Sequence, residues 1–514
     1  MANGDPAAGK EQDNYLRGMP NIQRLNRRQF LALGASGTSV LFLGQCMAGQ
    51  SRSQLPVAPT HTSSIEGLLD VSLDARYEAI NIAGRQAYLY SYNGQIPGPQ
   101  LEAKPDDTVR IRFNNSLSNP TNIHYHGLHV PPTGNADNVF LSIPNGESLT
   151  YEFTIPDNHP GGLFYYHPHR HGFVAEQVFG GLGSMFVIRG DLDQIPEVKA
   201  AKEEFLFLKD FALDANGRVP PPWHMDLMWG REGQLVTVNG QVNPSISIPQ
   251  GGLLRLRLLN ASNARFYRLT LEEHPFYLIA TDGIAIDEPV ELRELLLAPG
   301  ERADILVQGD REPGQYRLLD LPYSRGQMGM MGPGMMRPGM MGRGRMGPGR
   351  VGQADTGGPR TLATLNYSGQ VEAIPLPQQL IPVEALPEPQ TVRQFTLNHS
   401  MVPRMGMVFL INGKTFDHRR IDTQVPLNTV EDWEVINTGV MDHPFHLHTN
   451  PFQVMSRNGQ PEPYRAWKDV VLIRPGEAVR LRARFKDFPG KTVYHCHILD
   501  HEELGMMGII EMTA

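Results

Sequence analysis

The chain has 514 residues, of which 40% are hydrophobic and 19% charged, with a formal net charge of −8. At about 150 residues per domain this length predicts roughly three domains, and the mild acidity provides no basic surface for nucleic acid. The 52 glycines and 42 prolines favour many short strands over long helices, and the presence of only two cysteines excludes a disulfide framework.

Residues 1–48 have the features of an export signal. Arg27 and Arg28 precede the apolar run Phe30–Leu43, which at about 14 residues is too short to span a bilayer. The arrangement resembles the bacterial twin-arginine signal, so we expect export in folded form to the periplasm or the cell exterior, without stable membrane insertion. A lipid anchor on Cys46 is the alternative, although the preceding residues LGQ form a poor lipobox.

Three later segments of the chain resemble one another, namely 91–116, 237–262 and 410–439. Each contains an Asn-Gly turn signal followed by an alternating strand that ends in asparagine. These internal repeats predict three β-sandwich domains. A low-complexity insertion, residues 327–350, lengthens the spacing between the second and third copies, and its stretch 328–346 holds eight of the 22 methionines.

Ten of the 18 histidines fall into four short clusters, each containing the pattern His-x-His. In a strand, residues i and i+2 point to the same face about 6–7 Å apart, so one pair can reach adjacent metal ions. A single pair of this kind is usually a surface or core feature, but four pairs favour metal binding. The clusters are His124 and His126; His167 and His169; His443, His446 and His448; and His495, His497 and His501.

Cys496 lies between two histidines of the last cluster, in the stretch VYHCHI. If this stretch is a strand, the thiolate points to one face while His495 and His497 point to the other. Two histidines, a cysteine and a weak axial methionine form the ligand set of blue copper sites. The sequence therefore predicts one copper on the thiolate side, joined through the backbone to further coppers on the opposite side.

The motifs HYHG, HPH, HPFHLH and HCHILDHEELGM together resemble those of three-domain bacterial multicopper oxidases of the laccase and cuprous oxidase type. The resemblance implies an all-β fold of three consecutive cupredoxin-like Greek-key β-sandwiches. The domains would span residues 65–190, 195–370 and 385–514. The first would carry type 2 and type 3 copper ligands, the second no metal, and the third the type 1 copper and the remaining ligands.

By the same resemblance the protein would bind four copper ions: one type 1, one type 2 and a type 3 pair. The axial type 1 ligand would be Met506, with Met507 as the neighbouring alternative. The implied ligands are, for type 1, His443, Cys496, His501 and Met506; for type 2, His124 and His446; and for type 3, His126, His167, His169, His448, His495 and His497.

The resemblance also implies a reaction in which a reductant gives up single electrons at the type 1 copper while dioxygen is reduced to water at the other three. Glu502 and Asp137 are candidates for a proton relay or for orienting a ligand, and solvated surface carboxylates are the alternative. The expected partners are dioxygen and a small reducing substrate, without nucleic acid, and the chain is expected to act as a monomer.

The sequence leaves the reductant open between Cu(I) and phenols or other small organic molecules. The methionines of 328–346 favour Cu(I), because thioethers are soft ligands. The four arginines of the insertion repel cations, however, and Gly439 stands where cuprous oxidases carry an acidic residue, although Asp442 is near. The alternatives are a dedicated cuprous oxidase for copper detoxification and a copper-less relative with a structural role in the cell envelope. A copper nitrite reductase is disfavoured, because it normally needs two domains per chain.

Overall fold

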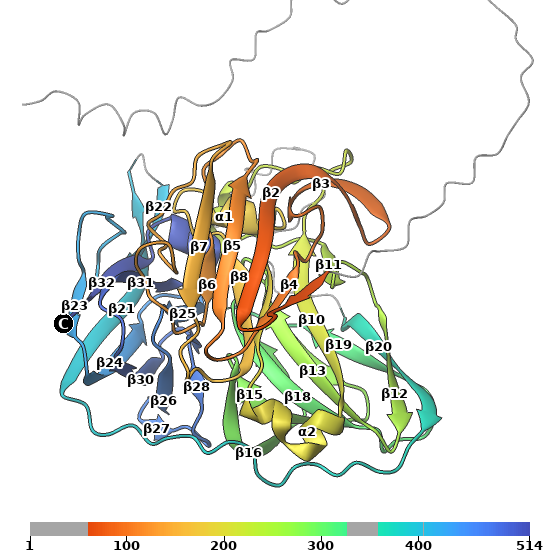
Figure 1. The fold of residues 1–514 in the computed structure, drawn as a ribbon. Coiled ribbons are helices and arrows are strands. Elements are labelled where there is room, and N and C mark those ends of the chain that lie inside the picture. Colours follow the sequence, from red (N-terminus) through yellow and green to blue (C-terminus); the bar gives the residue numbers. More distant parts are fainter. Residues whose placement is uncertain (1–59, 326–357, 404–405) are drawn as a thin grey trace, which may run out of the picture. The chain divides into compact units, whose positions relative to one another are not determined.

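The computed structural model describes residues 60–325, 358–403 and 406–514, and its strands form six sheets in three consecutive pairs (Figure 1). The predicted signal, residues 1–48, and the methionine-rich insertion, residues 327–350, lie outside the described residues. Among the described residues no helix is long and apolar enough to cross a membrane. The all-β prediction is confirmed.

The first pair of sheets is formed by residues 61–188 and includes a short helix, α1 (Val174–Phe179), in the connection between two of its strands. Alternating burial along its strands, as in Thr108–Asn115, reflects one face packed on the core and one facing solvent. In sheet order the strands are β1 (His61–Ser63), β4 (Gln100–Ala103), β9 (Ser184–Ile188), β8 (Gly162–His167) and β6 (His124–His126), and then β3 (Arg85–Tyr92), β2 (Leu68–Ile82), β5 (Thr108–Asn115) and β7 (Ser148–Thr154).

The second pair begins after the 3₁₀ helix η3 (Asp191–Gln194) and helix α2 (Pro196–Ala200) and includes helix α3 (His224–Trp229). In sheet order its strands are β11 (Leu235–Val238), β10 (Lys202–Phe211), β13 (Leu253–Asn260), β18 (Arg302–Gln308), β15 (Phe276–Thr281) and β16 (Ile284–Leu292), and then β12 (Ser245–Gln250), β20 (Arg360–Gln370), β19 (Gln315–Leu321), β14 (Tyr267–Leu271) and β17 (Leu295–Leu297).

The third pair contains the last helix, α4 (Leu499–Glu503), between its two final strands. In sheet order its strands are β22 (Gly406–Ile411), β21 (Thr391–Val402), β24 (Thr429–Asn437), β30 (Ala478–Phe485), β26 (Phe452–Arg457) and β27 (Gln460–Pro461), with β28 (Trp467–Lys468) also on β26, and then β23 (Thr423–Pro426), β32 (Met507–Thr513), β31 (Gly490–Cys496), β25 (His443–Leu447) and β29 (Val470–Ile473).

The repeated Asn-Gly turns have the same geometry in all three units. Asn93, Asn239 and Asn412 have φ values of 54°, 52° and 53°, and the glycine after each also has positive φ, as a type I′ turn requires. The Asn side-chain oxygen accepts, at 2.7–2.8 Å, a backbone N–H from the strand paired with the one that leads into the turn. The internal repeat seen in the sequence is therefore a repeat of local structure.

The asparagines that end the repeated strands are also equivalent. Asn115, Asn260 and Asn437 are fully buried, and each side-chain amide donates to two carbonyl oxygens, one in the loop that follows the strand and one in a segment 28–37 residues later. Each side-chain oxygen accepts the backbone N–H two residues later. A buried amide with all of its groups bonded fixes the loop that follows the strand, and in the first and third units that loop leads into a histidine cluster.

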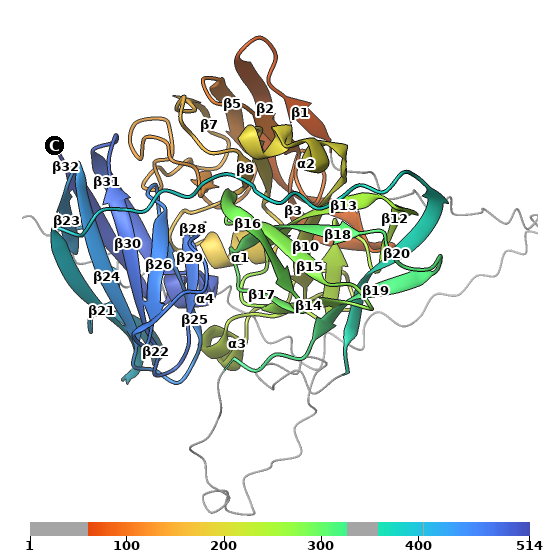
Figure 2. The same cartoon turned by 90° about the horizontal axis from the view of Figure 1, so that it is seen from below.

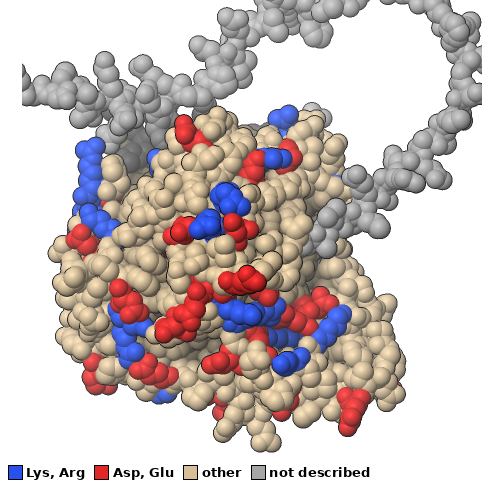
Figure 3. Space-filling model, in the orientation of Figure 1, with Lys and Arg blue, Asp and Glu red and all other residues tan. Residues whose placement is uncertain are grey.

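Each pair of sheets encloses its own apolar core, and the helices α1, α3 and α4 lie where the units meet (Figure 2). On the face seen in Figure 3, acidic and basic side chains of the described residues are interspersed rather than gathered by sign. The metal-ligand candidates are consequently held by rigid sheets at the contact between units, away from the charged surface.

Candidate metal centres

Two antiparallel strand pairs bring the four histidine clusters together. In the first unit β6 pairs with β8, so that His124 lies opposite His167. In the third unit β25 pairs with β31, so that His446 lies opposite His495 and Phe445 opposite Cys496. The predicted strand around Cys496 is confirmed as β31, which ends at that residue.

Eight imidazoles from the first and third units meet in one buried site. The rings of His124 and His448 stack with centroids 3.9 Å apart, and those of His126 and His446 stack at the same distance. All eight side chains are at most 2% exposed. The eight are His124, His126, His167 and His169 from the first unit, and His446, His448, His495 and His497 from the third.

Ring nitrogens in this site converge as ligand atoms do. Nε2 of His495 lies 3.1 Å from Nε2 of His169 and 3.0 Å from Nε2 of His448. Two nitrogens bound to one ion at about 2.0–2.1 Å, the usual imidazole–zinc distance, lie about 3–3.5 Å apart. Further sets of three ligand atoms within 4.8 Å of one another include His124, His126 and His167, and His124, His446 and His448.

Burial keeps these imidazoles neutral. It lowers the pKa of His167 to about 3 and that of His495 to about 4, and it lowers the pKa of the other six as well. A neutral imidazole has a lone pair free for a metal. Several buried ring nitrogens have no hydrogen-bond partner among the described residues, including Nε2 of His124, Nδ1 of His126, Nε2 of His167, Nε2 of His446 and both nitrogens of His497. These unpartnered atoms fit a metal cluster.

The second unit also borders this site. Gly300 has φ +83°, and a Cβ placed on it would lie 2.8 Å from the ring of His497. Any larger residue at position 300 would push His497 out of the cluster.

A separate set of ligand atoms surrounds Cys496. Its Sγ lies 3.5 Å from Nδ1 of His443 and 3.8 Å from Nδ1 of His501, and the two nitrogens are 3.3 Å apart. The N–H of Ile498 donates to Sγ at 3.4 Å. Burial lowers the pKa of His443 to about 3 and raises that of the thiol. A trigonal arrangement of two imidazoles and one sulfur is the arrangement of a blue copper site.

The two candidate axial methionines lie in different cores. Met506 is fully buried in the apolar cluster that contains Cys496 and Phe445. Met507 belongs to another cluster, with Val139 and Val493. The geometry thus favours Met506 as the residue beside the thiolate. Phe409 stacks on His501 at 3.8 Å and closes this site on another side.

Asp137 forms a hydrogen bond with the Nδ1 atom of His124. Both residues are buried, and the Asp137 carboxylate lies 2.8 Å from Nδ1 of His124 while accepting the N–H of Tyr125. Burial raises the pKa of Asp137 to about 8. The alternative of a solvated surface carboxylate does not apply, and the contact leaves Nε2 of His124 as the atom directed into the cluster.

Glu502 is also buried beside the cluster. Its oxygens lie 3.3 Å from Nδ1 of His495 and 3.9 Å from Nε2 of His169. Neither oxygen has a hydrogen-bond partner among the described residues, and burial raises the pKa of the carboxyl well above its usual value. The shift favours the protonated form of this carboxyl next to the site.

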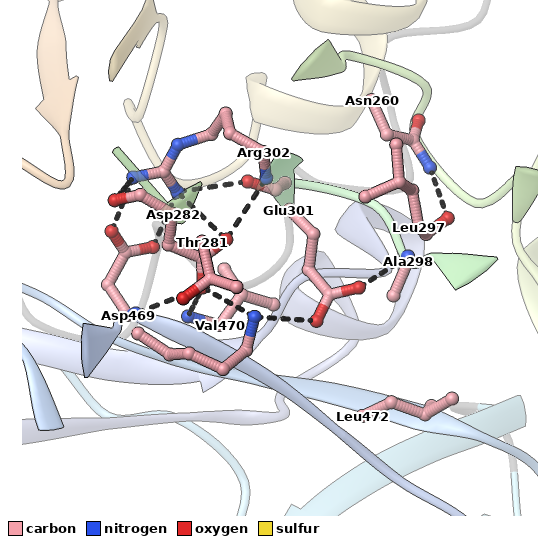
Figure 4. A network of polar contacts seen from close by, with 12 residues as sticks. Asn260, Thr281, Asp282, Leu297, Ala298, Glu301, Arg302, Asp469, Val470 and Leu472 are labelled. Carbon is pink, nitrogen blue, oxygen red and sulfur yellow. Dashed lines mark hydrogen bonds and ion pairs between the residues drawn. The ribbon is translucent and has the colours of Figure 1, made fainter. Parts of the chain in front are cut away.

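Sequence reasoning missed two residues next to this cluster. Asp469 lies 2.9 Å from Nε2 of His126, and Arg302 of the second unit forms an ion pair with Asp469 (Figure 4). A weak signal existed for Asp469, since this acidic residue directly precedes the wholly apolar strand β29. Arg302 carried no signal of a role at a site in other domains.

Comparison with known proteins agrees with this geometry. Three family models described as multicopper oxidase match residues 74–192, 209–330 and 385–513. Multicopper oxidase mco of Staphylococcus haemolyticus is 30% identical over 430 residues, covering 82% of this chain and 83% of that protein. Cell division protein FtsP of Proteus mirabilis is 27% identical over 513 residues, covering 95% and 99%. A solved multicopper oxidase from Campylobacter jejuni, described as a metallo-oxidase, matches with a TM-score of 0.76 at 32% identity, covering 89% and 95%.

The chain therefore belongs to the multicopper oxidase family. It is an oxidoreductase that uses dioxygen as acceptor and copper as cofactor, and the predicted fold of three cupredoxin-like domains is confirmed.

Proposed function

We propose that the protein oxidises a small reductant one electron at a time at a type 1 copper and reduces dioxygen to water at a trinuclear copper cluster. When bound, copper supplies the one-electron redox chemistry that the side chains lack. The observation that carries the proposal is the pair of adjacent ligand sets, with Cys496 in one set and His495 in the other.

The residues fit four coppers. His443, Cys496, His501 and Met506 would hold the type 1 ion, and His124 and His446 the type 2 ion. Ligand atoms of His169, His448 and His495 already converge, so these three would hold one type 3 ion. The other would be held by His126, His167 and His497, whose rings lie within 5.7 Å of one another, centroid to centroid.

The carboxyl groups have separate tasks in this proposal. Asp137 orients His124 through Nδ1. Glu502, kept protonated by burial and close to His495 and His169, supplies protons at the cluster.

The proposed reductants are phenols or other small organic molecules, and Cu(I). Cu(I) is supported by the methionines of 328–346 and by exposed thioethers on the described surface, since Met225 is 40% and Met401 58% exposed. The similar Campylobacter jejuni protein is described as a metallo-oxidase.

Oxygen uptake by the copper-loaded protein, with Cu(I) or a phenol in turn, tests the reaction and the reductant together. The companion variant deletes residues 328–346. Loss of Cu(I) oxidation with retained phenol oxidation would assign Cu(I) to the methionine-rich segment. Unchanged Cu(I) oxidation would make the segment dispensable, and no uptake with either reductant in protein holding its copper would refute the oxidase proposal.

A structural role in the cell envelope is the second candidate, since the chain also resembles cell division protein FtsP. The complete set of buried ligand atoms argues for the oxidase. A purified protein that binds no copper would favour the structural role instead.

The twin arginines of residues 1–48 support export in folded form, and we propose a monomer in the periplasm or outside the cell.

A further inference from the structure

We propose that Arg302 of the second domain, which holds none of the proposed copper ligands, positions the ligand His126 of the first domain by clamping Asp469 of the third. The inference rests on the proposed trinuclear site. It makes Arg302 and Asp469 positioning residues and gives the second domain a direct part in building the site.

The clamp is a buried bidentate ion pair (Figure 4). Nη1 of Arg302 donates to Oδ1 of Asp469 at 2.7 Å and Nη2 donates to Oδ2 at 2.6 Å. The Arg302 side chain is fully buried and that of Asp469 is 4% exposed. Two parallel bonds from a planar guanidinium fix the plane of the carboxylate as well as its position, which a lysine would not do.

All five N–H groups of the guanidinium are used. Besides the two bonds to Asp469, Nε donates to Leu163 O, Nη1 to Gly300 O and Nη2 to Asp282 O. These carbonyls belong to the first and second domains, so Arg302 touches all three domains at once. A side chain with every donor engaged has a single orientation, and the carboxylate it clamps inherits that orientation.

The main chain at Asp469 is fixed by the second domain too. A carboxylate oxygen of Asp282 accepts the N–H groups of Asp469 and Val470 at 3.1 and 3.2 Å, and it pairs with Lys468 at 3.0 Å. The second oxygen of Asp282 accepts the N–H of Arg302. The Asp282 side chain therefore connects the backbone of Arg302 to the backbone of Asp469.

Asp469 in turn orients the rings of two proposed copper ligands, His126 and His446. Its Oδ1 lies 2.9 Å from Nε2 of His126, and its backbone carbonyl lies 2.7 Å from Nδ1 of His446. Each contact requires the N–H on that ring edge, since both partners are acceptors. The opposite nitrogens, Nδ1 of His126 and Nε2 of His446, are the buried atoms left without a partner. One residue thus decides which nitrogen each histidine presents to the cluster.

Gly127, the residue after His126, leaves the room for this arrangement. It has φ +85°, and a Cβ on it would lie 2.6 Å from Oδ2 of Asp469 and would also overlap Arg302. The clamp consequently packs against the backbone beside the histidine that it orients.

The second domain offers a matched control. Arg255 pairs with Asp304 through Nε at 3.0 Å and Nη2 at 2.6 Å, and both side chains are at most 4% exposed. Its other ion-pair partners are Asp193 and Glu203, which are carboxylates and not histidines. Arg255→Met therefore removes an equally buried arginine pair from the same domain without touching the proposed ligands.

The test compares Arg302→Met, Arg302→Lys and Arg255→Met in the full copper-loaded protein. The measurements are copper per chain after graded chelation, the electron paramagnetic resonance signals of type 1 and type 2 copper, and the melting temperature of the copper-free form. We expect Arg302→Met to lower the affinity for the trinuclear coppers by about 10–100-fold, as loss of an outer ligand partner does in other metal sites.

We also expect an altered type 2 signal and an unchanged type 1 signal in Arg302→Met. Arg302→Lys should fold and show the same change in weaker form, and Arg255→Met should lose melting temperature while retaining wild-type copper affinity. Wild-type affinity and type 2 signal in both Arg302 variants would overturn the inference, as would equal copper loss in Arg255→Met. If the wild-type protein itself binds no trinuclear copper, the proposed function fails instead, and the two failures are therefore distinguishable.

Discussion

His495 and Cys496 are consecutive residues of β31, and their side chains lie in different ligand sets. Nε2 of His495 is 3.0 Å from Nε2 of His448, while Sγ of Cys496 is 3.5 Å from Nδ1 of His443. Alternation along the strand separates the two sets, and the backbone between the residues joins them. The shortest covalent connection between the proposed copper centres therefore runs within one dipeptide.

Cys496→Ser should remove the type 1 copper and leave the other three in place. Serine lacks the soft thiolate, whereas the imidazoles of the larger cluster point to the opposite face of β31 or come from other strands. We expect copper to fall from about four to about three per chain, the type 1 resonance signal to vanish with the type 2 signal retained, and oxidation of a phenol to fall to background.

His495→Gln is the complementary variant, because it removes a ligand of the larger cluster at the residue next to Cys496. It should retain the type 1 signal and weaken the trinuclear site. If both variants lost both signals to the same extent, the two ligand sets would not be separable and the assignment of these neighbours would be wrong.

Glu502→Gln should slow dioxygen reduction and leave reduction of the type 1 copper unaffected. Glutamine keeps the size of the side chain and removes the proton that burial holds on Glu502. Loss of a general acid typically costs about 10²–10⁴-fold in rate. Oxygen uptake measures the first effect, and anaerobic bleaching of the type 1 copper by a phenol measures the second.

Glu503→Gln is the control for Glu502→Gln. Glu503 accepts the backbone N–H of Gly172 at Oε2 and that of Ala175 at Oε1, near the start of α1, so a glutamine keeps the size of the side chain and one of these two bonds. Equal loss of oxygen uptake in the two variants would argue for a shared structural role and against proton supply by Glu502.

The sequence could predict much of the site, because its ligands follow local rules. The His-x-His spacing determines which side chains share a face of a strand, and the Asn-Gly turns fix the hairpins at Asn93, Asn239 and Asn412. The central position of Cys496 between His495 and His497 predicts two ligand sets on opposite faces, and the geometry around β31 agrees.

The clamp on Asp469 could not be predicted in this way. Its bond to His126 joins residues 343 positions apart, and its bond to Arg302 joins residues 167 positions apart. Neither contact follows a period or spacing, because each depends on how separate domains pack. The burial of Asp137 and Glu502 could not be predicted from the sequence either, since a carboxylate in a loop or a short helix is expected to be solvated until the domain that covers it is known.

Met506→Leu should raise the potential of the type 1 copper with little loss of stability. Leucine fills nearly the same volume in the core that contains Cys496, so the free energy of unfolding should fall by less than about 1.5 kcal/mol. Loss of a weak thioether ligand removes electron donation to the oxidised ion, and redox titration followed by the type 1 absorption measures the shift.

Met507→Leu makes the same exchange at the next residue, in the core of Val139 and Val493. Its potential should match that of the unaltered protein. A shift in Met507→Leu and none in Met506→Leu would mean that the axial ligand had been assigned to the wrong methionine.

The copper-free protein should lose stability as the pH falls below neutrality. Burial lowers the pKa of all ten clustered histidines in the folded state, for example to about 3 for His443 and about 4 for His495. In the unfolded chain these groups titrate near about 6.5. Below that pH the unfolded state takes up protons that the folded state cannot, so stability is present above about pH 6.5 and is lost progressively as the pH falls toward 4.

Seven buried or largely buried carboxyls with raised pKa act in the opposite direction, namely Asp137, Asp226, Glu301, Asp442, Asp469, Glu502 and Glu503. Their stabilising contribution is present at low pH and is lost as the pH rises through their folded pKa values. The ten histidines outnumber them, and each histidine costs up to about 1.4 kcal/mol per pH unit. Calorimetry of the copper-free protein should show a melting temperature at least about 5 °C lower at pH 5 than at pH 7. A melting temperature that is constant or rises between pH 7 and pH 5 would show that the carboxyls, and not the imidazoles, dominate the proton balance of the empty site.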